Sequence, residues 1–192
     1  ALGANTTGNN NTAFGHSTLT VNTTGTANVA IGLQALNQNN ASSNVAVGQN
    51  ALYLNTTGGS NVAVGHQALK ANTTASYNTA IGRDALEDNT TGTSNVAVGA
   101  FSLEENTTAS YNTAVGAYAL ESNTTGANNT AVGYEALTSV TTNSHNTAVG
   151  YWALLNNDAQ YNTALGKEAV RENTSGSRLV GVGNRALYSN TT

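Results

Sequence analysis

Hydrophobic and polar residues alternate in a short phrase that recurs along the whole chain. The phrase reads Asn, then Thr or Val, then Ala, then Val or Ile, then Gly, as at 78–82 and 112–116. Its closing Gly recurs eleven times, from Gly15 to Gly183, at spacings of 16 or 17 residues. Alternation of β-branched and small residues that ends at a Gly predicts a short strand followed by a turn. A repeat of fixed length indicates a structure that stacks on itself.

We number the positions of each repeat as slots 1 to 17, beginning at the Asn of the phrase. Two repeats are one residue shorter, and both lose that residue within the polar stretches 39–44 and 156–162. Because turns tolerate deletions better than strands, this part of the repeat is predicted to be a second corner. The sequence therefore predicts an all-β fold, a parallel β-solenoid of about eleven 17-residue coils with two short strands in each. At about 4.8 Å per coil the rod would be about 50 Å long.

Four columns of identical or similar residues define the expected core and corners. Slot 4 is aliphatic in all but one coil, which has Phe14, and slot 9 is Leu in all but one, so both columns are predicted to form the core. Slot 5 is always Gly, which suits a corner that needs a positive φ or a close backbone approach. Slot 12 is Asn from Asn5 to Asn190, with Val140 as the exception, and a stacked column of amides is predicted to satisfy the second corner.

Slots 3 and 8 are occupied almost entirely by Ala. In a strand, slot 3 lies on the opposite side from slots 2 and 4. An outward position should vary, whereas these stay small, so we expect a second packed surface where another chain approaches closely. Each coil has few large aliphatic groups to offset the entropy of ordering its backbone. The sequence therefore predicts a side-by-side homotrimer.

Charge is scarce and confined to a few slots. Of sixteen charged residues, fourteen lie in slots 6, 7, 10 and 11, which are predicted to face water, and only Asp158 and Arg178 lie elsewhere. The net charge of −4 argues against a nucleic-acid partner, and no apolar run is long enough to insert into a membrane. The chain has no Cys, which excludes disulfides and cysteine-based metal sites.

The phrase, repeated from Asn11–Gly15 to Asn162–Gly166, resembles the head repeats of trimeric autotransporter adhesins, and similar repeats occur in phage tail-fibre shafts. The resemblance implies a β-roll in which three chains pack side by side, located outside the cell at a bacterial surface or in a virion tail fibre. The coil is longer than the usual head repeat. Residues 1–192 are expected to be a single repeat array, a segment of a longer fibre chain.

Asymmetric chemistry is sparse, which favours a protein that is not an enzyme and has no cofactor. His16 and His66 share slot 6 but lie three coils apart, so no metal site is predicted from them. Acidic residues stack in slots 10 and 11 at 87–88, 104–105 and 121, an arrangement that favours a solvated strip over a weak Ca²⁺ site. The repeated Asn-Thr-Thr triplets are interpreted as corner geometry, in preference to glycosylation sites or an ice-binding array.

The least repetitive exposed feature is a group of aromatic residues over four successive coils. These candidate binding residues are Phe101, Tyr118, Tyr134, Tyr151 and Trp152. Stacked aromatics on a solvated face suit recognition of a glycan or a protein, and packing against a neighbouring chain or loop is the other interpretation. The predicted function is a structural or adhesive fibre segment that displays variable residues on a stiff rod. A repetitive face that itself binds ice or glycan is the alternative.

Overall fold

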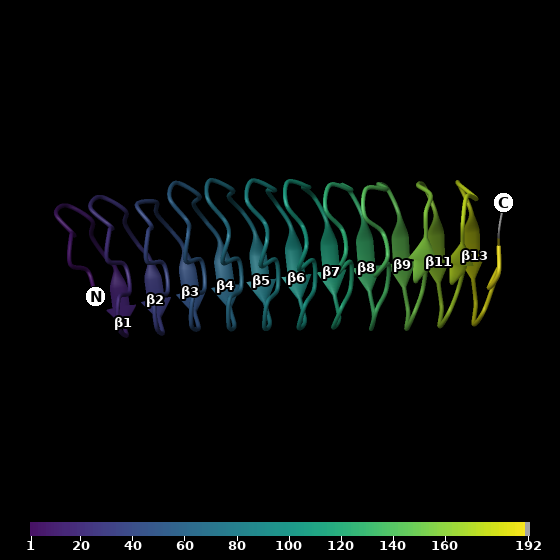
Figure 1. Cartoon of the computed structure of the whole chain (residues 1–192), viewed down its shortest axis with the longest axis horizontal. Helices are drawn as coiled ribbons and strands as arrows, with labels where there is room; N and C mark the ends of the chain where they lie inside the picture. Colours follow the sequence, from purple (N-terminus) through teal and green to yellow (C-terminus); the bar gives the residue numbers. More distant parts are fainter. Residues whose placement is uncertain (191–192) are drawn as a thin grey trace.

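The computed structural model describes residues 1–190 and shows a parallel β-solenoid (Figure 1). One three-residue strand from each coil joins an 11-stranded parallel sheet, in which neighbours along the sheet are successive coils. The chain advances steadily along the rod from one end to the other. The strands of this sheet are β1 (Thr12–Phe14), β2 (Val29–Ile31), β3 (Val45–Val47), β4 (Val62–Val64), β5 (Thr79–Ile81), β6 (Val96–Val98), β7 (Thr113–Val115), β8 (Thr130–Val132), β9 (Thr147–Val149), β11 (Thr163–Leu165) and β13 (Val180–Val182).

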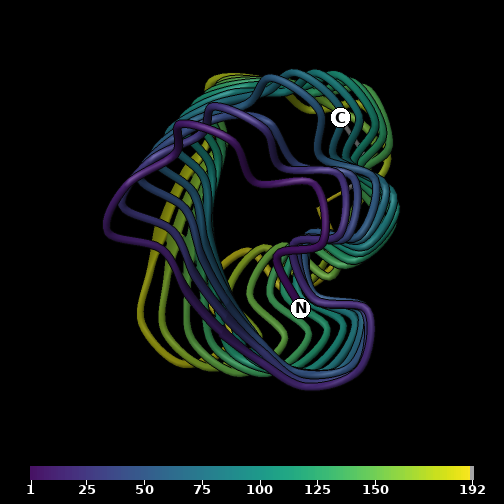
Figure 2. The same ribbon diagram turned by 90° about the vertical axis from the view of Figure 1, so that its left-hand side faces the viewer.

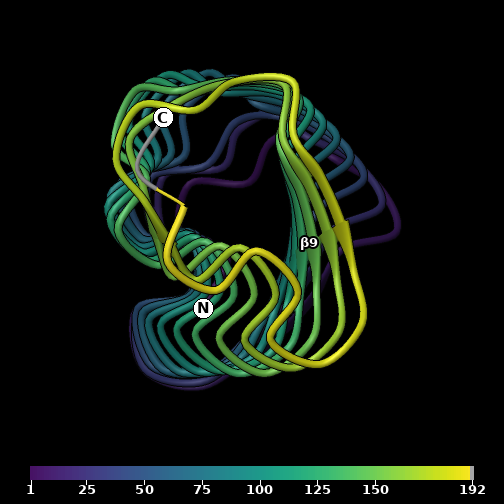
Figure 3. The ribbon, with the colours of Figure 1, turned by 90° about the vertical axis from the view of Figure 1, so that its right-hand side faces the viewer.

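The register of the sheet places each slot against the same slot of the next coil. Ala97 of β6 pairs with Ala114 of β7, and the same pairing of equal slots repeats along the sheet. This confirms the predicted solenoid with one coil per repeat. The expected second strand forms in only two coils, as β10 (Asn156–Asn157) and β12 (Glu172–Asn173), while turns make up the rest of each coil among the described residues. Viewed from its two ends, the rod is a set of superimposed loops (Figures 2 and 3).

The assignment of inside and outside along the strand was wrong. The slot 3 alanines from Ala30 to Ala164 are completely buried within the single chain, whereas slot 4 residues such as Ile31 and Ile81 are 37% and 41% exposed. The coil is narrow, so a methyl group fills the space opposite the buried Leu of slot 9, and the larger branched side chains of slots 2 and 4 point outward. The core therefore consists of Ala at slots 3 and 8 and Leu at slot 9, and these alanines cannot line a seam between chains.

The corners depend on residues in left-handed or extended positive-φ conformations. All eleven slot 5 glycines have φ between 121° and 142°, as the sequence predicts. A Cβ on Gly99 would lie 2.5 Å from the carbonyl carbon of Gly116 in the next coil, so the corner also needs the close approach that only Gly permits. The Leu column of slot 9 is left-handed too, with φ between 45° and 55°, although Leu rarely adopts this conformation. Burial of the Leu side chain offsets that backbone strain.

Two columns of buried Asn side chains hold the second corner. In slot 12, Asn72 Nδ2 donates to Asn55 Oδ1 of the preceding coil at 2.7 Å and to the carbonyl of Ala75 in its own coil at 3.1 Å. In slot 1, the backbone N–H of each Asn donates to the side-chain oxygen of the Asn one coil earlier, as Asn95 does to Asn78 at 2.9 Å. The predicted slot 12 column is confirmed, and the slot 1 column is a second one that was not predicted from the sequence.

The first shortened coil shows how a deletion is accommodated. In full coils the slot 13 and slot 14 N–H groups donate to the slot 13 carbonyl of the next coil, as Thr56 and Thr57 do to Thr73. In the short coil, the side chain of Asn40 replaces that carbonyl: its Oδ1 accepts from the N–H groups of Thr23 and Thr24, both at 2.9 Å. The missing residue therefore lies in a turn, as predicted, and a side-chain amide substitutes for the lost backbone.

Candidate functional site

The five aromatic residues predicted as a surface patch form one continuous column on the outside of a corner. Phe101 and Tyr118 stack with ring centroids 5.1 Å apart and an interplanar angle of 10°. Tyr118 meets Tyr134 edge to face at 5.9 Å, Tyr134 stacks on Tyr151 at 5.5 Å, and Tyr151 lies 4.5 Å from the Trp152 ring. The repeat places the rings of Phe101, Tyr118, Tyr134 and Tyr151 in successive coils, close to the separation that aromatic pairs prefer, while Tyr151 and Trp152 are neighbours in one coil.

Cationic side chains extend this aromatic column at both ends. The Arg83 guanidinium lies 5.2 Å from the centroid of Phe101, and the Lys167 ammonium lies 5.7 Å from Tyr151. Arg171 lies 4.5 Å from Trp152 and also contacts the Tyr188 ring at 5.5 Å. These contacts are within the range of cation–π attraction. They make the column a packed structure that continues through the C-terminal coils.

The packing of the column limits the ways in which it can bind a ligand. Rings that stack on one another within the column cover each other's faces, and a sugar that packs against an aromatic ring needs an open face. Tyr134 and Tyr151 remain 42% and 40% exposed, so part of each ring is still accessible to a partner. The geometry thus supports a packing role for the column within the chain, and recognition through it stays a prediction.

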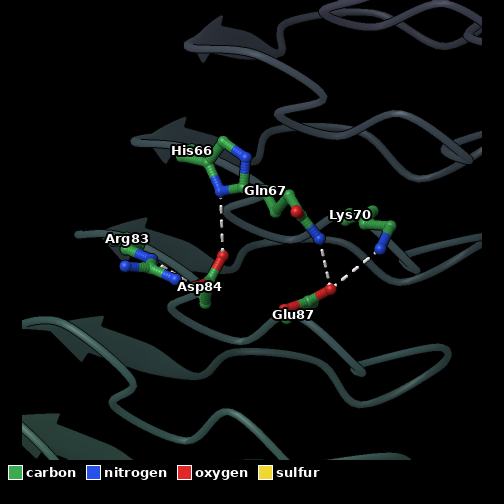
Figure 4. Close-up of polar contacts among 6 residues, drawn as sticks. All are labelled: His66, Gln67, Lys70, Arg83, Asp84 and Glu87. Atoms are coloured by element: carbon green, nitrogen blue, oxygen red, sulfur yellow. Dashed lines mark hydrogen bonds and ion pairs between the residues drawn. The ribbon is translucent and has the colours of Figure 1, made fainter.

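A group of ion pairs lies in the two coils before that of Phe101, on the N-terminal side of the aromatic column (Figure 4). Asp84, only 4% exposed, receives contacts from His66 of the preceding coil at 3.1 Å and from Arg83 at 2.8 Å. Glu87 contacts Lys70 at 2.9 Å and accepts a hydrogen bond from the Gln67 side chain. In a C-terminal coil, Glu168 is equally buried. Asp84 and Glu168 contradict the prediction that all charged slots face water, and each is paired with a cation, as a buried carboxylate requires.

The acidic strip of slots 10 and 11 shows the effect of unpaired carboxylates. Partial burial, together with the nearby charge of Glu121, raises the pKa of Glu104 to about 7. Burial and the charge of Glu105 also raise the pKa of Glu121. By contrast, hydrogen bonding to Arg185 lowers the pKa of Glu168. Among the described residues, no group of three or more His, Cys, Asp or Glu side chains is arranged to hold a metal ion.

The repeated Asn-Thr-Thr triplets are part of the fold. The slot 12 Asn side chains, such as Asn55 and Asn106, are completely buried and hydrogen-bonded, so a glycan could not be attached to them in the folded chain. The slot 13 hydroxyls donate to carbonyls of the next coil, as Thr90 does to Thr107 at 3.0 Å. Adjacent slots 13 and 14 therefore do not present a double row of free Thr hydroxyls.

Two hollows lie beside the second shortened coil, and neither is among the sites that the sequence predicts. One, of about 310 Å³, is lined in part by Asn143, Asp158, Gln160, Tyr161 and Arg178. The other, of about 230 Å³, is lined in part by Ser139, Asn156 and Asp158. The signal that could have located them is present in the sequence. Asp158 and Arg178 are the two charges outside the regular slots, and Asp158 lies in a shortened repeat.

No family model, curated protein or solved structure matches the chain. No helix in residues 1–190 is long and apolar enough to cross a membrane.

Proposed function

We propose that the chain is a non-enzymatic fibre segment, a stiff rod that self-associates and displays variable residues along its outside. The observation that supports this most strongly is the in-register stacking of equal slots along all eleven strands of the sheet. Rows of backbone hydrogen bonds, buried Asn columns and the Leu column run continuously through most of the rod. Such an arrangement provides length and stiffness, whereas copied slots do not assemble the asymmetric group of residues that catalysis requires.

The outer face of the 11-stranded sheet is the surface we assign to self-association. Slots 2 and 4 of every strand contribute Val, Ile, Thr or another uncharged side chain, and Val96 and Val98 of β6 are only half-buried. Eleven strands at about 4.8 Å, each three residues long at about 3.3 Å per residue, make a face of roughly 500 Å². Three such faces meeting on an axis would bury about 1,500 Å² in total, or about 500 Å² for each pair of chains, which is small for a pairwise interface but is repeated three times around the axis.

This arrangement moves the expected homotrimer seam from the slot 3 and 8 alanines to slots 2 and 4. An uncharged aliphatic face of this length on a water-exposed sheet is a typical site of association. The resemblance to trimeric autotransporter heads supports three copies and a location at a bacterial cell surface. The resemblance to phage tail-fibre shafts supports a virion as the alternative location.

A mass measurement tests this assignment. Sedimentation equilibrium of the chain is expected to give three times the monomer mass. Replacing Val98 and Val115 with Lys should yield monomers with an unchanged circular dichroism spectrum, because buried unpaired charge is costly at an interface but not in water. The matched control replaces Ala100 and Ala117 with Lys. These residues directly follow the corner glycines of the same two coils, outside the strands, so this variant should remain trimeric. A monomeric native chain, or dissociation by the control alone, would contradict the assignment.

A second candidate is a repetitive binding face for ice. Slots 2 and 4 point to the same side and form two regular columns with Thr at several positions, including Thr113 and Thr130. Slots 13 and 14 do not present a double row of free Thr hydroxyls, whereas the columns of slots 2 and 4 lie side by side on one face. A monomeric chain that lowers the freezing point of its solution would favour this function over the fibre segment.

A further inference from the structure

The two shortened coils differ in how a side chain replaces the deleted residue. In the first, Asn40 Oδ1 accepts three hydrogen bonds shorter than 3.0 Å, from the N–H and hydroxyl groups of Thr23 and from the N–H of Thr24. In the second, no side chain of the described residues makes such a set of bonds. Asp158 occupies the equivalent place, but its Oδ1 accepts a longer bond of 3.3 Å from the side chain of Asn143 instead. Asp158 is exposed, and the hollow of about 310 Å³ opens beside it.

The side chains that line this hollow differ from those of every regular corner. Asp158 brings a carboxylate and Arg178 a guanidinium, the two charges that break the slot pattern. Asn143 and Gln160 bring side-chain amides. Tyr161 brings a 48% exposed ring, which stacks on His145 at 4.9 Å with an interplanar angle of 4°, so one face of the ring is covered and its plane is held.

We propose that this hollow binds one neutral sugar residue. A carboxylate and amide oxygens accept hydrogen bonds from hydroxyl groups, while the amide and guanidinium N–H groups donate to them. The part of the Tyr161 ring that lines the hollow offers an apolar surface for the C–H groups of a sugar ring. One negative and one positive side chain border the hollow, which favours a neutral ligand over an ion. Its volume lies at the lower end of the range for small-molecule sites, enough for a single ring.

The inference does not rest on the proposed fibre function, because it concerns one irregular coil and holds equally for a monomer or a trimer. It also differs from the predicted aromatic patch, which lies on the other corner. The aromatic column has its ring faces covered, whereas the hollow combines a ring with hydrogen-bonding groups at one place.

The test is a titration of the intact, isotope-labelled chain with glucose, galactose, mannose and N-acetylglucosamine, followed by the NMR signals of the Asn143 and Gln160 side-chain amides. At least one sugar is expected to shift these signals with a dissociation constant on the order of 1 mM, since a small ligand in a shallow site gains little binding energy. Tyr161→Ser should weaken binding by about tenfold or more, because it removes the apolar platform. Inserting one Thr after Asp158, which restores a 17-residue coil and fills the hollow, should abolish binding without altering the melting temperature.

The matched control is Tyr77→Ser, at the same slot and with the same backbone φ of 64°, but in a coil of full length. It should leave sugar binding unchanged. Gln160→Ala is a second variant of the site, and it should also weaken binding. Because it keeps the stack between Tyr161 and His145, it tests the site even if Tyr161→Ser lowers the melting temperature. The proposal is overturned if none of the four sugars shifts the amide signals. It is equally overturned if Tyr77→Ser weakens binding as much as Tyr161→Ser, or if both Tyr161→Ser and Gln160→Ala bind as the native chain does.

Discussion

Val140 interrupts the slot 12 column of Asn amides in an otherwise regular part of the rod. The preceding member, Asn123, donates normally to Asn106 at 3.0 Å, but its own Oδ1 is buried and has no hydrogen-bond partner. Val140 is itself fully buried at the position where the next amide would lie. Replacing Val140 with Asn is therefore expected to complete the column and stabilise the folded chain.

The size of the effect follows from the groups that gain and lose partners. A buried acceptor without a partner costs about 1–3 kcal/mol, and the new amide would donate to Asn123 Oδ1. A further bond to the carbonyl of Asn143 in the same coil, as slot 12 residues make elsewhere, adds about 1 kcal/mol. Loss of the buried Val side chain costs about 1.5 kcal/mol. The net stabilisation is about 0.5–2.5 kcal/mol, which corresponds to a rise in melting temperature of about 1–10 °C for a chain of this size.

Differential scanning calorimetry of three variants measures this directly. Val140→Asn should melt above the native chain, whereas Val140→Ala, which leaves a cavity and no amide, should melt below it. Asn106→Val makes the reverse change in an intact stretch of the column. It breaks the bonds to Asn89 and Asn123 and should cost about 2–4 kcal/mol. A chain that is destabilised by Val140→Asn, or that tolerates Asn106→Val without loss, would refute the view that the amide column holds this corner.

Two further outcomes are expected. Because the pKa of Glu104 is raised from 4.5 to about 7, the folded chain binds a proton that the unfolded chain has released; this stabilising contribution is full below about pH 4.5 and is lost as the pH rises through about 7. Between about pH 4.5 and 8, the melting temperature of Glu104→Gln should therefore depend less on pH than that of the native chain. An equal pH dependence in the two chains would show that Glu104 is not its source. Replacing Tyr151 and Trp152 with Ser should lower the melting temperature if the aromatic column serves packing, as its covered ring faces indicate. Reduced adhesion at unchanged stability would instead establish recognition by these residues.

Much of the fold follows from the repeat itself. The constant Gly of slot 5 identified the corner, because a side chain there would collide with the next coil. The one-residue deletions near Asn40 and Asp158 correctly predicted the position of the second corner. A turn can accommodate a deletion that would shift a strand out of register. The slot 12 Asn column was predictable since stacked coils bring identical amides within hydrogen-bonding distance. The clustering of the aromatic residues was likewise readable from their shared slots.

Local pattern could not decide which side of the strand faces inward. Alternation shows that slots 2 and 4 share one side of the strand and slots 1 and 3 the other. Because both sides carry uncharged residues, the alternation does not show which side faces the core. The tertiary structure decides it through the width of the coil: with Leu103 of slot 9 filling the interior, only a methyl group such as that of Ala97 fits opposite, and Val96 and Val98 must point outward. The same physical limit explains the hollow beside Asp158. A deletion is visible in the sequence, but whether a side chain fills the resulting space depends on where that side chain lies in three dimensions.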